Sequence, residues 1–358
     1  MKQSLNFDFL NSNKIFYPLF CYGPMILQGK KDFFPWAVEI HPTAKCNHCC
    51  IHCSYKTRNE NRKELSYETF ISLINSLIKM KVKGVYFSGG GEPTLYPYIL
   101  EGIEKLTSNE IEVALITNGS YFEKSGLLEI ADKLNYIAIS VPSCNPDKFK
   151  FITGRNFCDR ILELPQKIKN KFGNSSPIVG ARVVITNHIV EEVPEILTNL
   201  KDKNFDYAIF KVVRDYEDQG LGLSNEAIET LKQEIAILKN NGEIDDDFTN
   251  IEKIFDYKKA YNSSGYCYIS QLGLTGAITP EGDVYHNISE IGKNEFCIGN
   301  INNDKLDKLW NSDRHNSVKA HSNEEWKQGK CKNCRAISYN LILNNLLNKI
   351  PCKEDPFI

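Results

Sequence analysis

The stretch from Cys46 to Cys53 constrains this chain most, because it sets three cysteines at the spacing Cys46-x3-Cys50-x2-Cys53 directly after an apolar run. Thiols this close together in a sequence predict a metal site. A fourth cysteine, Cys49, lets the same stretch be read as two Cys-x2-Cys pairs, which is the pattern of a structural zinc site. The spacing alone leaves both ligand sets open.

Composition places the chain among ordinary globular proteins. Its 358 residues, of which 42% are hydrophobic and 25% charged, are enough for one large domain or two, and we expect two. A formal net charge of −2 gives no electrostatic case for nucleic acid or an anionic membrane as partner. The sequence shows neither a signal-peptide layout nor an apolar run of membrane-spanning length, so we expect a cytoplasmic protein. In that reducing compartment, clustered cysteines more often bind metal than form disulfides.

Periodicity predicts an α/β fold. Short apolar or β-branched runs alternate with amphipathic stretches, such as 193–201 and 225–239, that have helical spacing. Six such units in succession imply a parallel sheet with right-handed crossovers, and therefore a partial (β/α)6 barrel rather than a closed barrel of eight. The predicted strands are residues 36–41, 84–88, 111–117, 135–141, 178–186 and 206–213.

Unusual residues follow the predicted strands, at the edge where parallel barrels assemble their active sites. The cysteine loop, residues 46–53, follows the first strand, and the glycine turn Ser88-Gly-Gly-Gly-Glu-Pro93 follows the second. Glycine and asparagine at strand ends are also common turn residues, and that interpretation stays open for Asn118-Gly119. The residues that follow the later strands are Asn118, Ser140, Asn187 and Arg214.

The cysteine loop followed by a glycine turn resembles the radical S-adenosylmethionine (radical SAM) superfamily. The resemblance implies that Cys46, Cys50 and Cys53 bind three irons of a 4Fe–4S cluster, and that Cys49 is a bystander. The fourth iron is left open for the amino and carboxylate groups of SAM. Glycines lack a Cβ, so Gly89, Gly90 and Gly91 allow close approach of a ligand, and Glu92 completes the Gly-Gly-Glu motif of the family.

The resemblance also assigns residues around SAM. His52 stands where the family usually has an aromatic residue beside the adenine. Ser140 keeps the serine of a Ser-x-Asp segment that faces the ribose, although the acid is replaced and Ser143 is an alternative contact. Arg182 alternates with apolar residues, so it points either into the barrel toward a carboxylate or out into solvent. We include Asn118 among the candidate cofactor-binding residues.

The C-terminal part resembles the SPASM and shorter twitch extensions of radical SAM enzymes, which carry auxiliary iron–sulfur clusters. Residues 269–278, a turn at 280–283 and residues 284–286 predict a β-hairpin. SPASM domains place a cysteine five residues after the hairpin glycine, and here that position is Asn287. We expect one auxiliary 4Fe–4S cluster, although a zinc ribbon has the same Cys-x2-Cys spacing. Its expected ligands are Cys267, Cys331 and Cys334 with Cys297 as the fourth; His286, Cys352 or an open iron are the alternatives.

These motifs predict three segments: a cap at residues 1–35, the barrel at 36–240 and an auxiliary cluster domain at 241–358. The resemblance implies reductive cleavage of SAM, with electrons from a donor such as flavodoxin or ferredoxin, and hydrogen abstraction by the 5′-deoxyadenosyl radical. Because 35 residues are too few for the leader-binding domain of many peptide-modifying relatives, we expect a small polar metabolite as substrate, to be oxidised, epimerised or rearranged. The alternatives are a maturase of a ribosomally made peptide and a non-enzymatic zinc-binding module.

Overall fold

The computed structural model describes residues 17, 18, 20–22, 33–56, 58–213, 215, 219–244, 247–251, 254, 266–331, 334 and 337–347, excepting the side chains of 58, 59 and 345–347. The chain forms two compact units. The first unit contains the described residues of 40–67 and 86–254, and the second contains those of 17–39, 68–85 and 266–347. No helix in the described ranges is long and apolar enough to cross a membrane. The predicted boundaries at residues 35 and 240 stay predictions.

All six predicted strands form, each within two residues of its predicted bounds. They lie in the order β6-β5-β4-β3-β2-β1; β3 to β6 belong to the first unit and pair in parallel, whereas β1 up to Glu39 and β2 up to Val85 belong to the second. The predicted α/β fold is thereby confirmed, but the helix expected after each strand is wrong for β3, which is followed by the short 3₁₀ helices Leu127–Glu129 and Ala131–Lys133. The strands are β1 (Ala37–Ile40), β2 (Gly84–Phe87), β3 (Glu112–Thr117), β4 (Tyr136–Ser140), β5 (Ile178–Ile185) and β6 (Tyr207–Val212).

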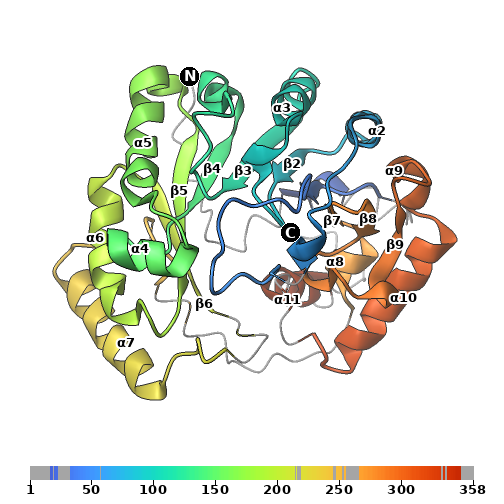
Figure 1. Cartoon of the computed structure of the whole chain (residues 1–358). Coiled ribbons are helices and arrows are strands. Elements are labelled where there is room, and N and C mark those ends of the chain that lie inside the picture. Colours follow the sequence, from blue (N-terminus) through green and yellow to red (C-terminus); the bar gives the residue numbers. More distant parts are fainter. Residues whose placement is uncertain are drawn as a thin grey trace, which may run out of the picture. The chain divides into compact units, whose positions relative to one another are not determined.

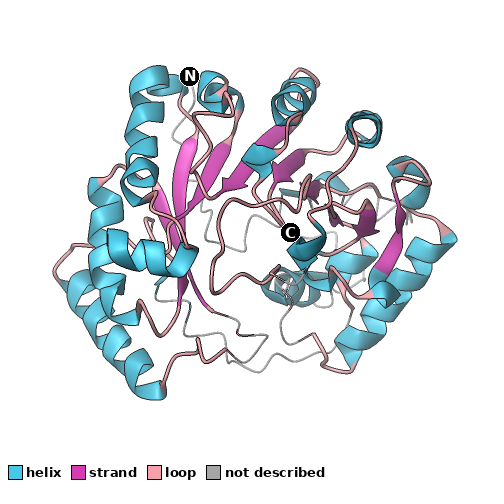
Figure 2. Cartoon of the chain, viewed as in Figure 1, coloured by secondary structure: helices cyan, strands magenta, loops and turns pink. Residues whose placement is uncertain are grey.

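Helices cover one side of these strands, as Figures 1 and 2 show for α3, α5 and α6. Strand β5 has the matching alternation: Val179, Ala181 and Val183 are buried, while Arg182 between them is partly exposed. Its register pairs Arg182 with Ser140 at the end of β4. The helices of this unit are α3 (Ile99–Thr107), α4 (Pro146–Thr153), α5 (Cys158–Phe172), α6 (Val193–Asp202) and α7 (Asn225–Asn240).

Helix α4 has well-defined ends, which matters because its last turn contacts the cysteine loop. The side chain of Asn145 accepts hydrogen bonds from the backbone N–H groups of Asp147 and Lys148, and Pro146 occupies the first helical position. Gly154, with a left-handed φ of 71°, ends the helix. The carbonyls of the last turn are therefore free of the helix and available to the neighbouring loop.

The second unit orders its strands as β2-β1-β7-β8-β9, and β7 to β9 pair antiparallel. The predicted hairpin forms between β7 and β8, but the predicted strand at 269–278 is wrong in its first half, where residues 268–271 form the helical turn α8. Ile269 and Leu272 are buried at helical spacing, and Gly273, with a left-handed φ of 57°, ends the turn. The elements are α2 (Tyr67–Met80), α8 (Tyr268–Gln271), β7 (Thr275–Ile278), β8 (Asp283–Tyr285), β9 (Cys297–Asn300), α9 (Leu306–Leu309), α10 (Asp313–Lys327) and α11 (Ile337–Leu347).

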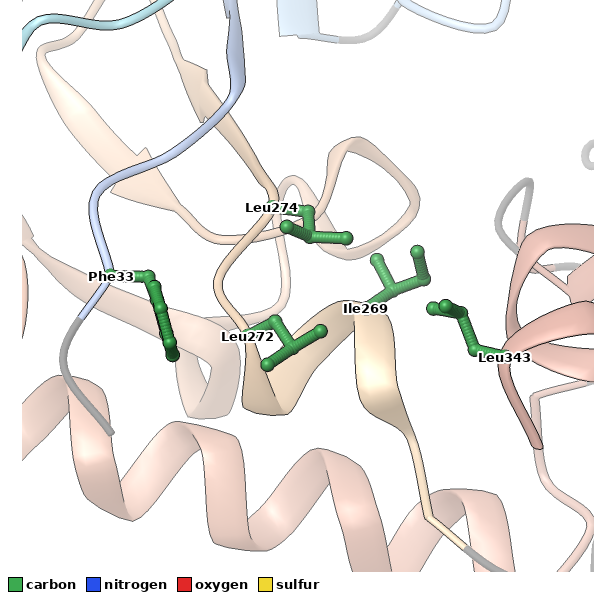
Figure 3. Packing of buried hydrophobic residues seen from close by; sticks show 5 residues of the cluster. All are labelled: Phe33, Ile269, Leu272, Leu274 and Leu343. Atoms are coloured by element: carbon green, nitrogen blue, oxygen red, sulfur yellow. The ribbon is translucent and has the colours of Figure 1, made fainter. Parts of the chain in front are cut away.

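A hydrophobic cluster in the second unit joins the N-terminal segment to the C-terminal helices. Figure 3 shows Phe33 with Ile269, Leu272, Leu274 and Leu343, and the partly buried Tyr22 packs against the same cluster. The backbone carbonyl of Phe33 also accepts a hydrogen bond from Trp310 Nε1 at 3.1 Å. Phe33 and Tyr22, from the segment expected to cap the barrel, therefore pack in the core of the second unit.

Candidate active site

The cysteine loop is held by backbone hydrogen bonds to the end of α4. The N–H groups of Cys49 and Ile51 donate to the carbonyls of Thr153 (2.8 Å) and Ile152 (3.0 Å). On the other side of the loop, Arg155 Nε donates to the carbonyl of Asn47 at 3.0 Å. The loop thus runs between the end of β1 and the end of α4, held by two backbone contacts that any sequence could supply and by the Arg155 side chain.

The thiols of this loop lie close enough to influence one another. Burial raises the pKa of Cys46 to about 11, and the nearby Glu92, Cys53 and Cys49 add to the rise. Burial also raises the pKa of Cys50, and the charges of Cys53, Cys46 and Cys49 reinforce it. A cation bound among these thiols would favour their ionised forms, so the donor set fits a positively charged metal group.

No group of three His, Cys, Asp or Glu side chains within the described ranges is placed to bind a single metal ion. An iron–sulfur cluster makes a different demand, because each thiolate binds a separate iron. Support for a cluster site therefore has to come from the residues that surround the cysteine loop.

The glycine turn, residues 88–93, packs directly on the chain that enters the cysteine loop. Gly91 N donates to Thr43 O at 3.0 Å, and Glu92 N donates to Lys45 O at 2.8 Å. A Cβ at Gly91 would lie 2.2 Å from the carbonyl oxygen of Lys45, and one at Gly89 would lie 1.9 Å from that of Gly91. Only glycine, which has no Cβ, allows these backbone contacts. The glycine turn therefore packs directly on the chain that enters the cysteine loop.

We expect Gly91→Ala to lower the free energy of unfolding by about 1–3 kcal/mol, because the added Cβ forces the backbone of Lys45 to move. Urea unfolding measures this change. Gly222→Ala is the matched control, since nothing lies within 4 Å of a Cβ there, and we expect it to stay within about 0.5 kcal/mol of the parent. Equal stabilities for the two variants would show that the turn does not need the glycine.

Glu92 is a buried carboxylate, 2% exposed, that braces the glycine turn against the end of β3. Its Oε1 accepts hydrogen bonds from Thr94 N (3.1 Å), Thr94 Oγ1 (2.7 Å) and Thr117 Oγ1 (2.5 Å), and its Oε2 accepts one from Asn118 N (2.7 Å). Burial raises the pKa of Glu92, while these four donors act in the opposite direction. The sequence placed Glu92 among the cofactor-binding residues; the structure shows its oxygens bonded to the protein's own donors.

Asn118 carries the same network to the cysteine loop. Its Nδ2 donates to Asn47 Oδ1 at 2.9 Å and lies 4.0 Å from Cys46 Sγ, while its Oδ1 accepts from Ser120 Oγ at 2.7 Å. Asn47 Nδ2 in turn donates to Ser120 Oγ at 2.8 Å. Asn118 is thus more than a turn residue. Sequence analysis missed Asn47 and Ser120, and their only signal was adjacency to Cys46 and Asn118.

The other candidates stand at different places in the first unit. His52 Nδ1 is buried with no hydrogen-bond partner among the described residues, and burial lowers the pKa of His52 to about 4, which keeps the ring neutral. Ser140 ends β4 and is partly exposed, whereas Ser143 is buried and donates to Glu192 at 3.0 Å. Arg182 Nε is buried and has no hydrogen-bond partner in the described part of the chain. Arg214 and Cys352 lie outside the described residues.

A second group of thiols, Cys267, Cys331 and Cys334, comes together in the second unit. Burial raises the pKa of Cys267, and the charges of Cys334, Cys331 and Glu290 reinforce it. Burial likewise raises the pKa of Cys331 to about 12, with Cys334 and Glu290 again contributing. Asn287 Nδ2 donates to Cys334 Sγ at 3.3 Å. The Cys297 thiol donates a hydrogen bond to the backbone carbonyl of Gly299, in its own strand, at 3.4 Å.

Comparisons with known proteins match both parts of the chain. Residues 40–200 match the model of the radical SAM superfamily, and residues 267–335 match the SPASM model, an iron–sulfur cluster-binding domain. The tungsten-containing aldehyde ferredoxin oxidoreductase cofactor-modifying protein of Pyrococcus furiosus is 25% identical over 170 residues, 46% of this chain and 48% of that protein. The GTP 3′,8-cyclase of Listeria monocytogenes is 29% identical over 172 residues, 47% of this chain and 51% of the cyclase. The chain spans about half the length of these curated relatives.

A solved structure shows the same fold over most of the chain. Streptococcus suis SuiB, bound to the precursor peptide SuiA, has a TM-score of 0.64 at 17% identity, with 96% of this chain and 80% of SuiB covered. The first matched domain implies a 4Fe–4S cluster with SAM, and the second implies auxiliary iron–sulfur binding. The chain therefore carries a radical SAM superfamily domain at residues 40–200, followed by a C-terminal SPASM domain at residues 267–335.

Proposed function

We propose that this protein reductively cleaves SAM and uses the resulting radical to abstract hydrogen from a substrate. The observation that carries the proposal is the direct packing of the glycine turn on the chain entering the cysteine loop, with Asn118 reaching both Glu92 and Asn47. When bound, the cluster and SAM supply one-electron cleavage of the sulfonium to a 5′-deoxyadenosyl radical. The protein supplies the ligands, their alignment and a dry site.

Cys46, Cys50 and Cys53 are the proposed cluster ligands. In this proposal the carbonyls of Gly89, Gly90 and Gly91 face the SAM ammonium, which the missing Cβ atoms permit. His52, with its neutral, partly buried ring, lies beside the adenine, and Ser140 faces the ribose. Glu92 and Asn118 act as positioning residues, since their hydrogen bonds fix the turn against the loop.

Cys267, Cys331 and Cys334 are the proposed ligands of the auxiliary cluster. Besides burial, Cys334 and Cys331 raise the pKa of Cys267, and Cys334 raises that of Cys331, as expected of thiols that share a site. The contact of Asn287 with Cys334 supports the same site. Cys297 stays the sequence-based prediction for the fourth ligand. An auxiliary cluster in a separate domain is suited to accepting the electron left on a product radical or to orienting the substrate.

We expect Cys331→Ala combined with Cys334→Ala to spare the initiating step. The double variant should retain about four of about eight irons and still form 5′-deoxyadenosine, uncoupled from product. Iron analysis and chromatography of the nucleoside measure the two quantities. Because thiolate–metal bonds can contribute to domain folding, circular dichroism and limited proteolysis serve as controls. A folded variant that holds about four irons but no longer cleaves SAM would contradict this division of labour.

For the substrate we propose a small polar metabolite that is oxidised, epimerised or rearranged, with electrons from a cytoplasmic donor such as flavodoxin or ferredoxin. Two relatives whose names refer to a cofactor and to GTP support a small molecule. A peptide maturase is the second candidate, because SuiB, which shares the fold, was solved with a precursor peptide.

Deuterium transfer separates these substrate classes. Extracts of cells grown in deuterated medium are divided by ultrafiltration into small-molecule and peptide fractions, and each is added to the reduced enzyme with unlabelled SAM. We expect deuterium in 5′-deoxyadenosine with the small-molecule fraction, before and after protease treatment. Transfer only from the peptide fraction, and its loss after protease treatment, would favour the maturase instead.

A further inference from the structure

The position where SPASM domains carry a cysteine is occupied here by Asn287, whose side chain has one fixed orientation. Its Oδ1 accepts a hydrogen bond from Ser289 N at 3.0 Å, and its backbone carbonyl accepts one from Glu290 N at 3.1 Å. Because the Ser289 N–H group needs an acceptor, the oxygen of the amide faces Ser289 and the NH₂ group faces away. Asn287 thereby caps the short 3₁₀ helix Ile288–Glu290.

The same orientation points the amide nitrogen at a thiol. Asn287 Nδ2 donates to Cys334 Sγ at 3.3 Å, and Asn287 is only 7% exposed. An amide nitrogen is a donor and not an acceptor, so this contact is a hydrogen bond to the sulfur and not a bond to iron. Because the amide is shielded from water, the hydrogen bond is stronger than the same contact in solvent.

A donor at a ligand sulfur changes how readily an iron–sulfur cluster takes up an electron. Reduction adds negative charge to the cluster and its thiolates, and an N–H group beside a thiolate stabilises that charge more in the reduced state than in the oxidised state. The donor therefore raises the reduction potential. A cysteine at position 287 would have the opposite effect, because a further thiolate adds negative charge.

We propose that Asn287 is a positioning residue of the auxiliary site: its side-chain amide donates to the Cys334 thiolate and raises the reduction potential of the cluster bound there. This inference rests on the proposed auxiliary cluster, with Cys334 as a ligand. The described donors to Cys46, a proposed ligand of the barrel cluster, are more distant, with His48 N at 3.5 Å and Asn118 Nδ2 at 4.0 Å. A close donor at Cys334 suits a cluster that accepts electrons, and weaker contacts at Cys46 suit one that donates them.

The test isolates the auxiliary cluster in the full chain with Cys46, Cys50 and Cys53 replaced by alanine. This parent should bind about four irons, and a redox titration followed by electron paramagnetic resonance gives the reduction potential of its cluster. If circular dichroism shows that the parent is unfolded, the same titration is made in the wild-type background with SAM added, and the signal that SAM does not alter is followed.

Two substitutions separate the donor from the cap. Asn287→Ser keeps an oxygen that can accept from Ser289 N but loses the N–H group that reaches Cys334, whereas Asn287→Ala loses both. We expect each to lower the equilibrium constant for reduction about tenfold, a shift of about −59 mV for one electron. Ser312→Ala is the matched control, because Ser312 caps α10 in the same unit by accepting from His315 N at 3.2 Å, and it should keep the parent's potential.

An Asn287→Ser variant with the parent's potential would overturn the proposal, because the amide would then serve only as a cap. A shift shared by Ser312→Ala would overturn it too, since the loss of any cap would then change the potential. Loss of iron from Asn287→Ser would show that Asn287 is needed for binding rather than for the potential. A parent without iron would overturn the auxiliary cluster together with this inference, while leaving SAM cleavage in the barrel untouched.

Discussion

Cys50→Ala should abolish SAM cleavage, whereas Cys49→Ala should keep most of it. Cys50 lies in the Cys-x3-Cys-x2-Cys register, and burial and the charges of Cys53, Cys46 and Cys49 all raise the pKa of its thiol. Cys49 is exposed, and its backbone N–H is the part that anchors the loop to Thr153. Alanine preserves that N–H, so Cys49→Ala removes a side chain without loosening the loop. Formation of 5′-deoxyadenosine by the anaerobically reduced variants is the measurement.

Iron content provides the control for this pair. Cys50→Ala should lose about four irons, because the barrel cluster can no longer be held by three thiolates, and Cys49→Ala should lose none. Equal losses of activity and iron in both variants would mean that the ligand set is wrong and that the two Cys-x2-Cys pairs act together.

Glu92→Ala should lower the free energy of unfolding by about 3–5 kcal/mol, the largest stability effect that we expect from a single change in this chain. The substitution leaves four donors around one buried position without their acceptor: Thr94 N, Thr94 Oγ1, Thr117 Oγ1 and Asn118 N. Each unsatisfied buried group adds a desolvation cost. Urea unfolding of the two proteins gives the difference.

The matched control is Glu104→Ala. Glu104 pairs with Lys133 at 3.1 Å, but both side chains are more than a third exposed, so we expect a loss of less than about 1 kcal/mol. A Glu92→Ala variant as stable as the Glu104→Ala variant would show that water replaces the carboxylate and that Glu92 does not brace the turn.

The six strands of the α/β fold could be predicted because each depends on a local sequence pattern. Each of the six strands is a short apolar run bounded by turn residues, and its bounds depend little on distant contacts. The sequence predicts a strand where the turn α8 forms, because the apolar residues Ile269, Leu272 and Leu274 are compatible with a strand as well as with a helical turn. Their burial against Phe33 and Leu343, which are far away in the sequence, decides between the two.

Some parts of the candidate site could also be predicted from the sequence, and others could not. The cysteine and glycine motifs carry their chemistry in adjacent residues, so the sequence was enough to find them. The hydrogen bonds around Glu92 and Asn118 join separated segments, such as Thr117 with Glu92 and Asn118 with Asn47. No spacing rule reports such pairs, because each partner alone is an ordinary polar residue.

The most direct measurement is iron, sulfide and zinc analysis of the anaerobically reconstituted protein, combined with an assay for SAM cleavage in the same sample. We predict about eight irons per chain, from two 4Fe–4S clusters, and formation of 5′-deoxyadenosine only when the protein is reduced. Stoichiometric zinc, no uptake of iron and no cleavage of SAM would contradict the account and leave a zinc-binding protein in its place.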